Sequence, residues 1–96
     1  MAMRGHESIP FVINGPIARS DIPGLCDRAG RLFLASGDRI VRCDVRDIDV
    51  DAVTVDALAR LQLAARRHGC QIRLWGASER LRDLVAFMGL EDVLPA

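Results

Sequence analysis

Apolar residues recur along this chain in two different spacings. Three short apolar runs predict β-strands at residues 10–14, 40–45 and 70–75. The last of these runs, CQIRLW, alternates apolar and polar residues. Because successive side chains of a strand point to opposite faces, we expect one face of it to be buried and the other to be half-exposed.

Apolar residues at three- and four-residue intervals between these runs predict helices. The first helix begins near Ser20 or Asp21, with Pro23 in its first turn, and stops before Gly37. The second begins with Thr54 or Asp51 as its N-cap and ends at Gly69. Ser78 and Gly89 bound the third, and a short apolar tail after it is expected to dock on the core.

The second helix, residues 54–68, is apolar around much of its circumference. Val55, Leu58, Leu61 and Ala65 form one stripe, and further alanines and leucines widen it. A helix of this kind packs on a sheet and also touches neighbouring helices. The alternation of strand and helix predicts one α/β domain over residues 10–96, with an open sheet and crossover helices, behind a loose segment at residues 1–9.

Composition narrows the possible functions. The 96 residues carry a formal net charge of zero, which argues against nucleic acid as the main partner. No apolar run approaches the roughly 20 residues that span a bilayer. The first ten residues, MAMRGHESIP, have no apolar core typical of a signal peptide, so we expect a cytoplasmic protein without membrane insertion.

The chain lacks several residues on which enzymes depend. All thirteen basic residues are arginine, which excludes a lysine Schiff base and a P-loop lysine. The two histidines, His6 and His68, have no ligand spacing, and the three cysteines lack a C-x-x-C pair. We therefore expect free thiols, no metal, no cofactor and no catalytic activity.

An acidic segment, residues 46–53, leads directly into the second helix. Its D-x-D-x-D pattern resembles the start of a calcium loop, but Ala52 and Leu58 replace the glycine and glutamate that such a loop needs. The segment also fits the D-x-D-x-V motif of haloacid-dehalogenase-type phosphatases. Those enzymes need a much longer chain and normally a lysine, so the motif does not indicate a phosphatase here. A solvated acidic loop that exposes a helix N-terminus predicts recognition of a partner.

The whole pattern resembles the STAS domain of anti-sigma-factor antagonists. The resemblance covers roughly residues 11–95 and is strongest over ARRHGCQIRLWGASERLRDLVAFMGLEDVL. It implies a four- or five-stranded mixed sheet with helices packed mainly on one face. In the antagonists of this family, a kinase-type anti-sigma factor phosphorylates a serine at the start of the long helix, and the unphosphorylated form binds that kinase.

The phosphorylation motif of the family, D-S-S-G-L, is altered in this chain to Asp51-Ala52-Val53-Thr54-Val55. Ala52 stands at the phosphoacceptor position and has no hydroxyl, whereas Thr54 is a possible phosphoacceptor only in a shifted register. The alternative is that Thr54 is a plain helix cap.

Two functions follow from the resemblance. The first is a regulator that docks a kinase-type anti-sigma factor or related signalling protein, as a monomer or weak dimer. The second is a structural STAS subunit that braces the ATPase of a bacterial lipid-transport ABC complex. The residues expected to contact the partner are Asp49, Asp51, Ala52, Thr54 and Asp56.

Overall fold

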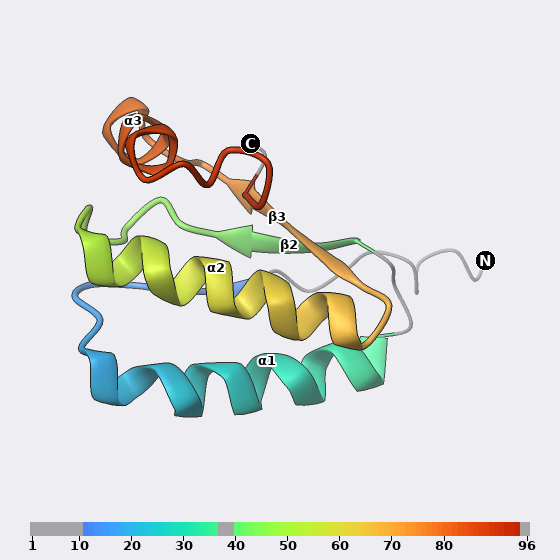
Figure 1. The fold of residues 1–96 in the computed structure, drawn as a ribbon. Helices are drawn as coiled ribbons and strands as arrows, with labels where there is room; N and C mark the ends of the chain where they lie inside the picture. The colour runs from blue at the N-terminus through green and yellow to red at the C-terminus, as the bar shows by residue number, and fades with distance from the viewer. Residues whose placement is uncertain (1–10, 37–39, 95–96) are drawn as a thin grey trace.

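The computed structural model describes residues 11–36 and 40–94, so the segment expected to be loose, residues 1–9, lies outside the described residues. Strands and helices alternate along the chain (Figure 1). The elements are β1 (Phe11–Val12), η2 (Arg19–Asp21), α1 (Ile22–Ser36), β2 (Ile40–Asp44), α2 (Ala52–Arg67), β3 (Gln71–Trp75) and α3 (Glu79–Phe87).

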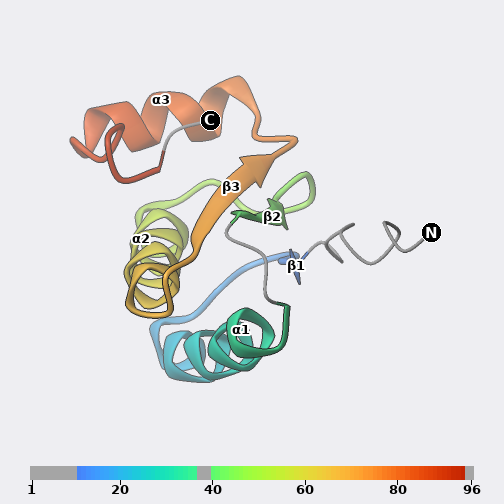
Figure 2. The same ribbon diagram turned by 90° about the vertical axis from the view of Figure 1, so that its right-hand side faces the viewer.

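The three strands form a parallel sheet in the order β1-β2-β3. Parallel neighbours need a crossover connection, and such crossovers are almost always right-handed. Two crossovers of the same hand, taken in the same direction across the sheet, place both of their helices on one face. Figure 2 shows this arrangement, with α1 and α2 on the same side of the strands and α3 beyond β3.

The core lies between this sheet face and the two crossover helices. Alternate residues of β3 are buried as the alternation in CQIRLW predicted, with Ile72 and Leu74 inward and Arg73 and Trp75 exposed. The stripe predicted for α2 is buried as well, and α1 contributes an apolar face of its own. The buried apolar side chains of the two helices are Ile22, Leu25, Ala29, Phe33, Val55, Ala57, Leu58, Leu61 and Ala65.

Helix starts follow local capping. Asp51 is the N-cap of α2, so that helix begins at Ala52, two residues earlier than the predicted range of 54–68. Ser78 caps α3 as predicted, and its hydroxyl accepts a hydrogen bond from the Leu81 N–H at 3.1 Å. Before α1, the Asp21 carboxylate accepts a hydrogen bond from the Ala18 N–H and closes a 3₁₀ turn.

A buried glutamine joins α2 to the outer edge of β3. Gln62 is fully buried, and its Oε1 accepts a hydrogen bond from the Ile72 N–H at 2.8 Å. Its Nε2 donates to the Ile72 carbonyl at 3.1 Å and to the Val93 carbonyl at 2.9 Å. The side chain thus acts as a strand partner for Ile72 and ties down the C-terminal tail, whose Leu94 is buried as expected.

The prediction of a small α/β domain is confirmed, with three parallel strands and three α-helices among the described residues. The sheet described is parallel and three-stranded, where a four- or five-stranded mixed sheet was expected. Within the described part of the chain, no helix is both long enough and apolar enough to cross a membrane.

Candidate functional site

Exposure alternates along a strip of the acidic segment before α2, residues 47–51. Asp47, Asp49 and Asp51 are exposed, whereas Ile48 and Val50 between them are half-buried. Asp47 lies in a turn, and Ile48 forms an isolated parallel bridge with Gly15. The acidic segment therefore holds its three carboxylates on one side, toward solvent.

Backbone hydrogen bonds fix this strip against the loop that follows β1. The Gly15 N–H donates to the Asp47 carbonyl at 2.9 Å, and the Asp49 N–H donates to the Gly15 carbonyl at 3.3 Å. Gly15 has a φ of +64°, a conformation that favours glycine. The backbone that carries the acidic carboxylates is thus hydrogen-bonded to a second loop at the end of the sheet.

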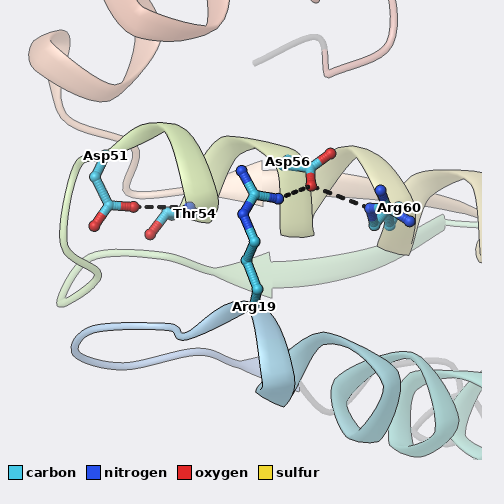
Figure 3. A network of polar contacts seen from close by, with 5 residues as sticks. All are labelled: Arg19, Asp51, Thr54, Asp56 and Arg60. Carbon is cyan, nitrogen blue, oxygen red and sulfur yellow. Dashed lines mark hydrogen bonds and ion pairs between the residues drawn. The ribbon is translucent and has the colours of Figure 1, made fainter.

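Asp51 connects the strip to the helix. Its backbone is extended, and its Oδ1 accepts a hydrogen bond from the Thr54 N–H at 2.8 Å (Figure 3). A carboxylate at this position satisfies one of the unpaired N–H groups of the first helical turn and interacts favourably with the helix dipole. Asp51 therefore has a structural role as the helix cap. Because it is exposed, it is also part of the surface.

Thr54 is placed differently from the other predicted site residues. Its side chain is fully buried. Its Oγ1 has no hydrogen-bond partner among the described residues. In this conformation the hydroxyl is not presented to a kinase, and Thr54 forms no part of the surface.

Asp56 lies one turn after Ala52, on the same side of α2, and is engaged in two ion pairs. Its Oδ2 lies 3.1 Å from an Arg19 guanidinium nitrogen and 3.1 Å from Nε of Arg60 (Figure 3). The contact with Arg19 joins α2 to the 3₁₀ turn before α1. Asp56 therefore fastens two elements together, and only 30% of its side chain is exposed.

The exposed members of the predicted site are thus Asp49, Asp51 and Ala52, to which the structure adds Asp47. We call Asp47, Asp49, Asp51 and Ala52 the acidic surface. Across the described residues, no three His, Cys, Asp or Glu side chains lie close enough together to hold a metal ion.

A second polar cluster, on the sheet, was missed by sequence reasoning. Arg46 forms a bidentate pair with Asp44, at 3.2 Å from Nε to Oδ1 and 3.0 Å between Nη2 and Oδ2. The hydrogen bonds from Arg46 hold the pKa of the Asp44 carboxyl below its ordinary value. The Arg46 guanidinium also stacks over the Trp75 ring at 4.3 Å from the ring centroid.

A groove of about 700 Å³ lies between the β1 segment and the first turns of α1. None of the five predicted contact residues lines it, and its charged lining residues are exposed, with both signs present. Those charged residues are Asp21, Asp27, Arg28 and Arg31.

Comparison with known proteins adds no family assignment, since no family model and no curated protein matches the chain.

Proposed function

We propose that this protein is a non-enzymatic binding domain that docks a signalling protein through the acidic surface at the start of α2. The observation that carries the proposal is the ordered display of three exposed carboxylates beside an exposed first helical residue, Ala52. Charges arranged in this way steer encounter with an oppositely charged partner and select against partners of like charge.

The resemblance to STAS domains suggests the class of partner. In anti-sigma-factor antagonists, the serine that the kinase-type anti-sigma factor phosphorylates lies at the start of the equivalent helix. We propose a partner of that class, or a related signalling protein, and a cytoplasmic site of action. The resemblance also implies that the complete sheet has four or five strands, and because Gln62 occupies the backbone groups of Ile72, a further strand would pair with β1.

Regulation by phosphorylation is not part of this proposal. A phosphate adds roughly −1.5 to −2 charges at neutral pH and would be repelled by the neighbouring aspartates. Ala52 has no hydroxyl, and the only hydroxyl in the first turn of α2, on Thr54, is buried. The domain is therefore proposed to bind constitutively.

Charge reversal tests the proposal without disturbing the helix cap. Asp47→Arg with Asp49→Arg changes exposed side chains that form no ion pair within the described chain, whereas Asp51 and Asp56 are structural. Glu91→Arg with Asp92→Arg makes the same change of charge at an exposed turn after α3.

Affinity capture from the native host, with quantitative mass spectrometry, would compare the two variants with the wild type. We expect a kinase-type regulator to be captured by the wild type and by the Glu91/Asp92 variant, and to be lost from the Asp47/Asp49 variant. Capture of the same proteins by all three forms would show that the acidic surface is not the interface.

The absence of an accessible hydroxyl at the start of α2 also favours a second candidate function, a structural STAS subunit that braces the ATPase of a lipid-transport ABC complex. Such a subunit needs no phosphorylation switch. It would co-purify with an ATPase in constant stoichiometry, and incubation with ATP would leave the mass of the chain unchanged. Phosphorylation of the chain in that incubation would exclude this role.

A further inference from the structure

The face of the sheet opposite α1 and α2 exposes large apolar side chains. The exposed fractions are 51% for Val12, 49% for Ile40 and 40% for Trp75. Each comes from a different strand. No described helix lies over this face in Figure 2.

This exposure is unusual for the type of sheet. Sheets with only parallel strands occur almost always with both faces covered, because each strand is otherwise left with an apolar face in water. Here both crossover helices lie on one face, and α3 lies beyond β3 rather than across the strands (Figure 2). A covering element on the other face is therefore expected.

Two arginines at the centre of this face point to the charge of that element. Arg42 and Arg73 are register partners on β2 and β3, and both are exposed. Neither forms an ion pair within 4.0 Å among the described residues. The nearby Asp44, whose pKa is lowered chiefly by Arg46 and to a smaller extent by Arg42, is paired with Arg46. Two guanidinium groups side by side repel each other unless anions are bound between them.

Trp75 favours a carboxylate-bearing partner over a nucleic acid. The guanidinium of Arg42 lies 5.1 Å from the centroid of the Trp75 ring and that of Arg46 lies 4.3 Å from it. A ring already stacked by cations is a poor platform for a base, and proteins that bind single strands depend on such stacking. The net charge of zero points the same way.

We propose that an acidic amphipathic helix of a partner protein docks on this open sheet face, defined by Val12, Ile40, Arg42, Arg73 and Trp75. Neighbouring strands lie about 4.8 Å apart. Residues one turn apart on a helix surface are about 5–6 Å apart, so two carboxylates at this spacing match the two arginines. Apolar side chains of the helix contact the aliphatic residues and Trp75 on either side.

Three strands present a width of about 10 Å between the outer strands, which is close to the diameter of about 10–12 Å of a single helix with its side chains. One helix therefore suffices to cover the part of the face that these three described strands form, and a further strand beside β1 would lie outside that part. This face is separate from the acidic surface and of opposite charge, so a test can refute one of the two binding proposals without refuting the other.

Trp75 is the only tryptophan of the chain, which makes its fluorescence a reporter for this face. The probe is a synthetic helix-forming peptide of about 20 residues, since shorter isolated helices are marginal in water. It carries a leucine stripe and two glutamates four residues apart. A second peptide has lysines in place of these glutamates, and a single-stranded oligothymidylate represents the nucleic-acid alternative.

The variant Arg42→Glu with Arg73→Glu removes the charge match. Arg80→Glu with Arg82→Glu makes the same change of charge at exposed positions of α3 and is the control. We expect saturable binding of the acidic peptide to the wild type and to the control, about tenfold weaker binding to the Arg42/Arg73 variant, and recovery with the lysine peptide. Recovery also shows that the variant is folded.

Four results would overturn the proposal. The first is the absence of a saturable change in Trp75 fluorescence with the acidic peptide. The second is equal binding of that peptide to the wild type and the Arg42/Arg73 variant. The third is binding of oligothymidylate, but not of the peptide, to the wild type. Self-association of the wild type that is abolished in the Arg42/Arg73 variant would assign the face to a second copy of the chain instead.

Discussion

Replacement of the buried Gln62 by methionine tests how the long helix is held to the sheet. Methionine has a similar length but neither donates nor accepts a strong hydrogen bond. Gln62→Met therefore removes three hydrogen bonds, two with the backbone of Ile72 and one with the Val93 carbonyl. The surrounding residues stay the same size, so the change in hydrogen bonding dominates the result.

The loss of stability depends on how deeply the backbone groups left without a partner are buried. A buried backbone group without a partner costs about 1–3 kcal/mol. Ile72 is only 2% exposed, so its N–H and carbonyl bear this cost, whereas Val93 is half-buried and its carbonyl is nearer to water. We expect Gln62→Met to lower the free energy of unfolding by about 3 kcal/mol, a large share of the 5–15 kcal/mol that is usual for a domain.

Urea unfolding monitored by circular dichroism measures this loss. With an m-value of about 1.5 kcal/mol/M, the midpoint should fall by about 2 M. The control is Gln71→Met, the other glutamine of the chain, which has no hydrogen bond of its side chain within the described structure and should change stability by less than about 0.5 kcal/mol. Equal midpoints for the two variants would refute the assigned role of Gln62.

Three further predictions use the same unfolding assay or simple chemistry. Asp51→Ala removes the cap of α2 and should cost about 1 kcal/mol; no loss would contradict the capping role. Asp44→Asn should be less stable than the wild type at pH 7, and the difference should shrink as the pH falls from 3.8 through the lowered pKa of Asp44, because the wild type then loses the same pairing. Burial raises the pKa of Cys43 to about 12, so iodoacetamide at pH 8 should label the half-buried Cys26 first; peptide mapping that finds Cys43 labelled first would be contrary to the structure.

The elements themselves were predictable because their signals are local. The alternation in β3, the stripe of α2 and the caps at Asp51 and Ser78 each depend on residues within one or two turns of one another. The ends were less well predicted. Thr54 was an equal candidate for the cap of α2, and the choice depended on which side chain reaches the first free N–H group.

The placement of Thr54 could have been foreseen. Thr54, Leu58, Leu61 and Ala65 are spaced by four, three and four residues, so Thr54 lies on the buried stripe of α2. Gln62 lies next to the same stripe, four residues after Leu58. In both cases the helical periodicity predicts a buried position, although the side chain at that position is polar.

The sheet cluster had no comparable signal. Asp44, Arg46 and Trp75 meet because β2 and β3 pair in one particular register, which the strands alone do not reveal. The acidic segment was an intermediate case. The loop predicted before α2 is confirmed over residues 46–51, but the bridge that holds Ile48 beside Gly15 joins two loops far apart in the sequence and has no local signal.

The acidic surface as the docking site is tested most directly by hydrogen–deuterium exchange on the complex captured from the native host. Exchange is compared between the free domain and the same domain bound to its partner. We predict that amides of residues 47–56 become slower to exchange in the complex. Unchanged exchange over these residues, with protection confined to other parts of the chain, would contradict the account.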